Sequence, residues 1–131
     1  MSIQFTTAAR NAQLDAITTS VGNAGKLKIY TGSAPSSAND SATGTLLSTH
    51  TLGSPFAPGA SSGVLTPTTP SNVTAGATGT AGYFRITKSD DTVVLQGTCG
   101  TSAADLILNT TSIVSGGPVQ VNSLSLTAGG A

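Results

Sequence analysis

The sequence has little charge of either sign. Only 8% of its 131 residues are charged, and five basic and five acidic side chains give a net charge of zero, whereas an ordinary soluble domain has about 25% charged residues. A nucleic-acid surface needs clustered basic side chains that displace counterions from the phosphates. The basic residues here are scattered along the chain, so we expect no nucleic-acid partner.

Long apolar runs and a leader segment are also missing. No stretch approaches the roughly 20 apolar residues that a membrane-spanning helix needs. The opening residues, MSIQFTTAARNAQ, do not have the basic start and apolar run of a secretory signal. We therefore expect a soluble protein from a cell interior, with no membrane partner.

Reactive side chains are scarce. The chain has one cysteine, Cys99, and one histidine, His50, so no internal disulfide can form. A thiol catalytic site would have to use these two residues, with Asp105 to orient the imidazole. However, free cysteine is commonly a small buried hydrophobe, and His50 falls at an outward position of a threonine-rich strand. We therefore interpret Cys99 as structural and expect a protein without enzymatic activity.

Ligand-binding patterns are equally weak. Asp90 and Asp91 are adjacent, but the oxygen-rich spacing of a calcium loop is missing, and turn formation explains both aspartates. The glycines of GATGTAG, residues 76 to 82, do not have the GxGxxG spacing of a dinucleotide-binding loop. We expect neither metal-binding nor cofactor-binding residues.

Serine, threonine and glycine dominate what is present. The chain contains 17 serines and 22 threonines, together 39 residues, and 16 glycines. Serine and threonine compete with helical hydrogen bonds, and glycine costs about 1 kcal/mol in a helix interior. Threonine and valine, in contrast, suit a pleated sheet. The composition predicts an all-β protein.

One segment, residues 7–21, has a helical pattern. Its apolar side chains are spaced by three and four residues: Leu14, Ile17 and Val21. Thr6 or Thr7 can cap the start, and Gly22 ends the pattern. Because the apolar stripe is narrow, we expect this short α-helix to lie on the edge of a sheet or on another subunit.

The rest of the chain reads as short strands between clusters of turn residues. Strands are expected at 26–30, 45–52, 64–65, 81–87, 92–98, 105–109 and 118–127. The segments 31–44 and 54–72 are predicted to be long surface loops, the first of them mobile. This spacing predicts a β-sandwich with jelly-roll-like topology, built as a single domain over residues 1–131.

Alternation within these strands assigns their faces. Leu27 and Ile29 are expected to point inward from the first strand, as are Phe84 and Ile86 from the hairpin strand. The outward residues would be Lys26, Lys28, Tyr30, Tyr83, Arg85 and Thr87. Arg85 can pair with Asp91 across the turn or contact a neighbouring subunit. In the last strand the alternation slips near Asn122 and Ser123, which predicts a β-bulge.

Several segments together resemble a group of small structural proteins of tailed bacteriophages. The matching stretches are RNAQLDAI in the helix, GKLKIYTGSAP, GTAGYFRI with its aspartate turn, and the closing GGPVQVNSLSLT. The turn departs from the group's pattern, since Asp90-Asp91-Thr92 stands where we would expect Asp-Gly-Thr. The resemblance covers most of the chain and includes head decoration, or cement, proteins.

The resemblance implies a virion protein on the capsid exterior, made in the host cytoplasm. Its partners would be the major capsid protein and further copies of itself, as trimers or dimers at local symmetry axes. Candidate interface residues are Leu14, Ile17, Val21 and Arg85. Two alternatives stay open: a carbohydrate-binding or adhesion module of a tail or fibre, and a hydrolase or thiol enzyme.

Overall fold

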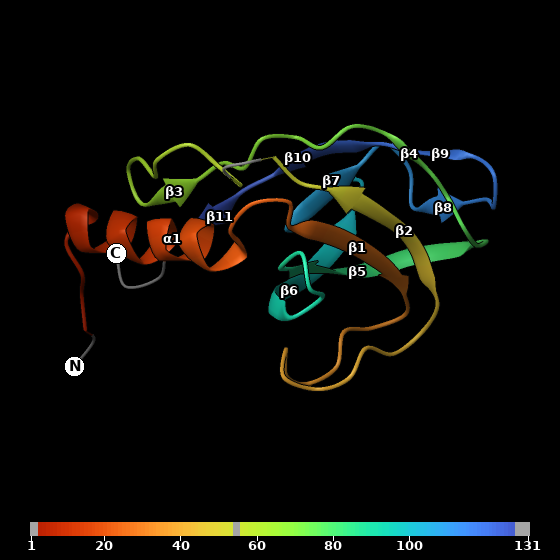
Figure 1. Cartoon of the computed structure of the whole chain (residues 1–131), viewed down its shortest axis with the longest axis horizontal. Coiled ribbons are helices and arrows are strands. Elements are labelled where there is room, and N and C mark those ends of the chain that lie inside the picture. Colours follow the sequence, from red (N-terminus) through yellow and green to blue (C-terminus); the bar gives the residue numbers. More distant parts are fainter. Residues whose placement is uncertain (1–2, 54–55, 128–131) are drawn as a thin grey trace.

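A computed structural model of the chain describes residues 3–53 and 56–127, so the first two residues of the expected loop 54–72 lie outside the described part. The helix is α1 (Thr7–Val21). The strands are β1 (Lys26–Thr31), β2 (Leu46–Thr51), β3 (Val64–Leu65), β4 (Val73–Thr74), β5 (Gly79–Thr87), β6 (Val93–Gly100), β7 (Leu106–Leu108), β8 (Ser112–Ile113), β9 (Pro118–Val119), β10 (Val121–Leu124) and β11 (Leu126–Thr127). Figure 1 shows their arrangement.

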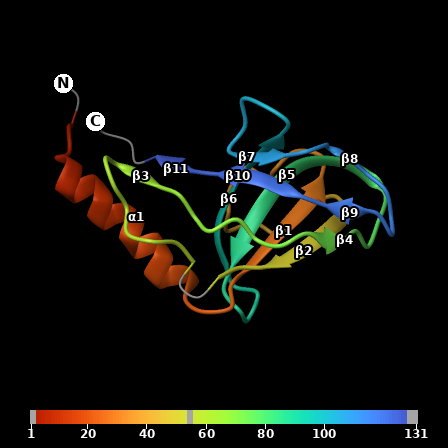
Figure 2. The same ribbon diagram turned by 90° about the horizontal axis from the view of Figure 1, so that it is seen from above.

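A curled sheet of seven strands forms the body of the protein. Six of its strands lie in the order β10-β7-β6-β5-β1-β2, and β8 pairs with β5 at the end of that long strand. The pairing of β6 with β7 is parallel, and the other pairings are antiparallel. Two small sheets, β11-β3 and β4-β9, lie along one side of it, the upper side in Figure 1, and Figure 2 looks down on them.

The architecture is therefore mainly β with one N-terminal helix, as the composition predicted, but it is not clearly a sandwich. A sandwich needs two extended layers that face each other. Here the strands after β6 are at most four residues long, and β10 and β7 continue the large sheet through β6. The sheet therefore curls into a half-barrel around the core.

The helix begins and ends where the sequence predicts. The Thr6 hydroxyl accepts a hydrogen bond from the Ala9 amide at 3.1 Å, and Gly22, at φ 69°, donates its amide to the Thr18 carbonyl at 3.1 Å. Both devices satisfy backbone groups that a helix end leaves unpaired. In both ribbon views α1 lies beside β3, at one end of the molecule (Figures 1 and 2).

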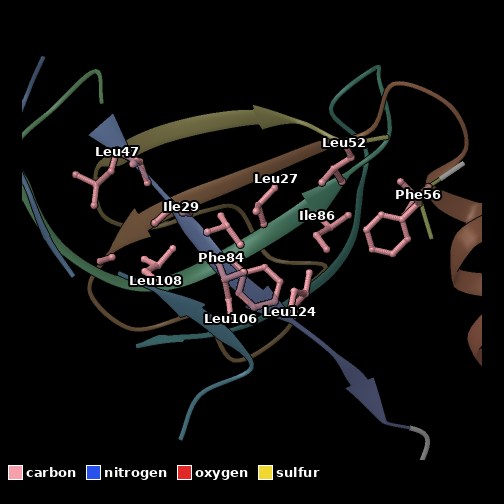
Figure 3. Packing of buried hydrophobic residues seen from close by; sticks show 14 of the residues in the cluster. Leu27, Ile29, Leu47, Leu52, Phe56, Phe84, Ile86, Leu106, Leu108 and Leu124 are labelled. Carbon is pink, nitrogen blue, oxygen red and sulfur yellow. The ribbon is translucent and has the colours of Figure 1, made fainter. Parts of the chain in front are cut away.

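The core fills the hollow of the curled sheet. Leu27, Ile29, Phe84 and Ile86 are all 0% exposed, which confirms the faces assigned by alternation. Figure 3 shows these side chains from β1 and β5 pointing toward leucines of β7 and β10. Phe56, which follows β2, closes one end of this cluster and is also fully buried.

Strand β5 is buried on both faces, which corrects one expectation. Tyr83, Arg85 and Thr87 were expected to point to solvent, yet they are 0%, 3% and 2% exposed. For Tyr83 and Arg85 the reason is the loop between β1 and β2, which folds over the outer face of the sheet. The Tyr83 hydroxyl donates to the Thr43 carbonyl at 2.6 Å and accepts from the Thr43 amide at 2.9 Å.

Two local irregularities agree with the sequence. Asp91 has φ 71° in the turn after β5, and Asp90 Oδ1 accepts a hydrogen bond from the Thr92 amide at 3.0 Å, as an aspartate turn does. In β10 the register with β7 shifts between Val121 and Ser123. This bulge returns Leu124 to the core, where it is buried.

Candidate functional site

His50 lies inside the protein, not on its surface as expected. It is a residue of β2 and is 0% exposed. Its Nδ1–H donates to the Ser71 carbonyl at 3.1 Å, which leaves Nε2 to accept from the Ser48 hydroxyl at 3.3 Å. Burial lowers the pKa of His50, and the bond to Ser71 opposes that shift only in part. The imidazole is therefore a neutral, internally bonded group.

Cys99 is remote from His50. Cys99 lies on β6, and β5 and β1 separate this strand from β2. The register places His50 in line with Leu95, four residues from Cys99 along β6, so the two side chains are not neighbours. Burial, with a smaller contribution from the Asp105 carboxylate, raises the pKa of the Cys99 thiol to about 12. Because the thiolate is the nucleophilic form, this thiol is held in its unreactive state.

Asp105 does not orient an imidazole either. Its Oδ2 accepts hydrogen bonds from the Thr98 amide at 3.0 Å and from the Thr98 hydroxyl at 3.2 Å. These bonds tie the start of β7 to β6, beside Cys99. His50, on β2, thus makes its hydrogen bonds away from Cys99 and Asp105. The three residues do not form a catalytic arrangement.

Asp91 is engaged by two lysines of the neighbouring strand. Its Oδ1 lies 2.8 Å from Lys28 Nζ and 3.0 Å from Lys26 Nζ. These bonds, that of Lys28 first, lower the pKa of Asp91. The carboxylate is therefore already neutralised by ammonium groups, and the described residues contain no cluster of three or more histidine, cysteine or acidic side chains that could hold a metal ion.

Arg85 occupies an unusual position. The expected pair with Asp91 does not form; the Arg85 Nε donates instead to Gln96 Oε1 at 3.2 Å, directly across the β5-β6 pair. Among the described residues, the buried Nη2 has no hydrogen-bond partner. Next to the side chain is a pocket of about 320 Å³, lined by Ala38, Asn39, Asp40, Ser41, Arg85, Thr92 and Val93.

A second, more apolar groove of about 370 Å³ lies between the helix and the sheet. It is lined by Gln13, Leu14, Ile17, Phe84, Leu95, Gln96, Gly97, Asp105, Ser125, Leu126 and Thr127. Of the helical residues expected at an interface, Leu14 and Val21 are 3% and 2% exposed, because the chain's own core covers them. Ile17 is half-buried and faces the groove.

Among the described residues, four other large apolar side chains are exposed, and the sequence patterns did not single them out. Ile3 and Phe5, ahead of the helix, are 75% and 42% exposed, and Leu46 and Val114 are 41% and 60% exposed. One sequence feature could have indicated the exposure of Ile3 and Phe5: they precede the helix cap, where no strand is expected to cover them. These residues give the protein apolar contact area outside its core.

Comparisons of this chain with protein-family models, with curated proteins and with solved structures gave no match. Within the described residues, no helix is both long enough and apolar enough to cross a bilayer. A functional proposal therefore has to rest on the motifs, the surface and the geometry of this chain.

Proposed function

We propose that this protein is a non-enzymatic structural protein of a tailed-phage virion, a decoration or cement protein that binds the outside of the capsid shell and stabilises it. Its partners are the major capsid protein and further copies of itself, as trimers or dimers at local symmetry axes. The motifs that resemble phage structural proteins support this assignment. We also propose that the mainly β fold is a variant of the jelly-roll-like sandwich.

The observation that carries the proposal is a surface with exposed apolar side chains and little free charge. Asp91 neutralises charge on Lys26 and Lys28, and Arg85 is buried, so few charges remain to steer or hold a partner. Ile3 and Val114, in contrast, are largely exposed. Apolar contacts and hydroxyl hydrogen bonds, repeated over a symmetric lattice, provide avidity without one strong site.

The carbohydrate-binding alternative has less support because the aromatic side chains are occupied. Tyr30 and Tyr83 stack on each other, with ring centroids 5.1 Å apart and an interplanar angle of 11°. Phe56 and Phe84 are fully buried, which leaves Phe5, at 42% exposure, as the aromatic residue most open to a ligand. A sugar-stacking platform would need more exposed rings than this.

Sedimentation of virions tests the assignment. Phage particles are sedimented in low salt and in about 1 M salt, where the Debye length falls to about 3 Å, and the 12.8 kDa band is quantified with heads and with tails. We expect the band to stay with the heads at both salt concentrations. Loss in high salt would refute the apolar attachment, and a band that follows tails alone would refute the decoration role.

A pair of neighbouring variants tests the contact surface. Phe5→Asp places a charge on an exposed apolar side chain, and we expect it to weaken rebinding to heads that lack the protein by at least about tenfold. Gln4→Asp adds the same charge at the adjacent exposed position and should bind as the wild type does. Equal binding by both variants would exclude Phe5 from the contact.

A further inference from the structure

We propose that the pocket beside Arg85 is a binding site for a carboxylate group, contributed by an acidic side chain of a partner protein or by a small free carboxylate. This inference does not depend on the decoration role. Three features of Arg85 support it. The guanidinium is buried without an ion pair, its Nη2 has no hydrogen-bond partner among the described residues, and a pocket lies beside the side chain.

Arg85 is a buried cation that forms no ion pair among the described residues. Arginine stays protonated in proteins, and a buried charge is normally paired, yet Arg85 is only 3% exposed. Within residues 3–53 and 56–127, the ion pairs are those of Asp91 with Lys26 and Lys28. Lys28 is also the residue directly opposite Arg85 on β1. One carboxylate thus pairs with two lysines, and the neighbouring guanidinium has no ion pair of its own among the described residues.

The orientation of the Arg85 guanidinium is set by Gln96. Gln96 holds Arg85 from one side only: its Oε1 accepts from Nε at 3.2 Å, while its Nε2 donates to the Pro35 carbonyl at 2.8 Å. Gln96 is therefore fixed by the β1-β2 loop and fixes the guanidinium in turn. The Nη2 group has no partner in the described part of the chain. The Nη2 atom is enclosed as well as unpartnered, so a carboxylate in the pocket reaches this edge of the guanidinium once the lining residues shift. A planar carboxylate matches that edge in both shape and charge.

The walls of the pocket carry hydroxyl groups as well as Arg85. Its volume is about 320 Å³, and Ser41 and Thr92 are among its lining residues, so hydroxyl groups are available as further donors. Asp40 also lines it, but Asp40 is exposed, and its Oδ2 lies 3.3 Å from the Ser36 hydroxyl instead of pairing with Arg85. Because Asp40 offsets part of the attraction of Arg85, and a dianion loses more hydration energy than a monoanion on entering the pocket, a carboxylate is favoured over phosphate.

The experiment follows the Arg85 Nε–Hε resonance by ¹⁵N NMR in the full chain. Sodium acetate is titrated at constant ionic strength against sodium chloride, and a capped peptide with a single glutamate is titrated in parallel, with sodium phosphate as the control anion. We expect saturable shifts with acetate at a Kd of about 10 mM, the range for one charged contact, and weaker effects from phosphate.

The two carboxylate probes distinguish the source. A peptide that binds at least about tenfold more tightly than acetate identifies an acidic side chain of a protein as the ligand, whereas equal affinities identify a small carboxylate. Both results support the site. Absence of saturable shifts with both probes up to about 100 mM would overturn it, as would tighter binding of phosphate than of acetate.

Two variants locate the binding. Asp40→Asn changes an exposed residue and removes the repulsion, so acetate should bind about threefold more tightly. Arg85→Lys retains the charge but loses the planar fork, and a folded Arg85→Lys protein should bind acetate at least about fivefold more weakly. If acetate binds Asp40→Asn but not the wild type, Asp40 itself is the partner of Arg85 in solution, and the proposal fails.

Discussion

Removal of the Tyr83 hydroxyl tests how the β1-β2 loop covers the sheet. This hydroxyl makes two hydrogen bonds to the backbone of Thr43, at 2.6 Å and 2.9 Å, and the ring stacks on Tyr30. The Tyr83→Phe variant keeps the ring and loses both bonds. Thr43 is exposed, so water can satisfy its backbone groups, and the expected loss is about 1–2 kcal/mol of unfolding free energy.

Truncation of the same side chain should cost more. Tyr83→Ala also removes a fully buried aromatic ring, for which about 3–5 kcal/mol is expected, the range that also applies to Phe84→Ala. The two alanine variants should therefore be destabilised to a similar degree, because both faces of β5 are covered. An outward Tyr83 would instead make its truncation nearly neutral.

Urea denaturation followed by circular dichroism measures these differences, and thermal melts should show a fall of about 4 °C per kcal/mol for a chain of this length. Thr43→Ala is the matched control. It keeps the backbone groups that bond Tyr83 and loses only a hydroxyl bond to the Ser33 carbonyl at 3.3 Å, so it should cost less than about 0.5 kcal/mol. A Tyr83→Phe protein as stable as the wild type, or a Tyr83→Ala loss below about 1 kcal/mol, would refute the loop packing.

Two further predictions concern His50 and Gly82. Because burial lowers the pKa of His50 below its usual 6.5, the unfolded chain takes up a proton first; the His50 contribution to stability should be complete above about pH 6.5 and be lost as the pH falls through the folded-state pKa. Urea titrations from pH 7.5 to pH 5 should show this loss in the wild type and not in His50→Gln, and equal slopes would contradict a buried neutral imidazole. A Cβ on Gly82 would clash with the Gly32 carbonyl oxygen, whereas one on Gly59 meets nothing within 4 Å. Gly82→Ala should therefore lower the unfolding free energy by about 1–3 kcal/mol, and Gly59→Ala should not. Equal melting temperatures for the two variants would show that the loop after β1 moves aside without cost.

Local features of this fold could be predicted from the sequence because they depend on residues that are close together in the chain. The helix bounds follow from the spacing of Leu14, Ile17 and Val21 together with the cap residues. The hairpin turn follows from aspartate's tolerance of a left-handed backbone, and Asp91 has φ 71°. The bulge in β10 follows from a slip in alternation, since a pleated strand returns to the same face only every second residue.

The candidate site could not be predicted from the sequence, because segments that are distant in the chain form it. The Arg85 pocket joins residues 38–41 to the turn after β5, and no local pattern brings these together. His50 was expected to face solvent since a threonine-rich strand gives no sign of what lies against it. Its imidazole is covered, and its Nδ1 bonds the carbonyl of Ser71, 21 residues away.

The sequence by itself determined the mainly β class of structure and the side chains of the inner face. It did not predict β4 or β8, and it treated residues 118–127 as one strand, which the structure divides into β9, β10 and β11. Alternation states which residues of a strand share a face, but it does not state whether a second layer covers the other face. For β5 that cover is the β1-β2 loop, held by Thr43 and Pro35. Only tertiary contacts decided that Tyr83 and Arg85 are buried and that the sheet curls through β6, β7 and β10, because loop closure and strand pairing over long separations depend on the packing of the whole chain.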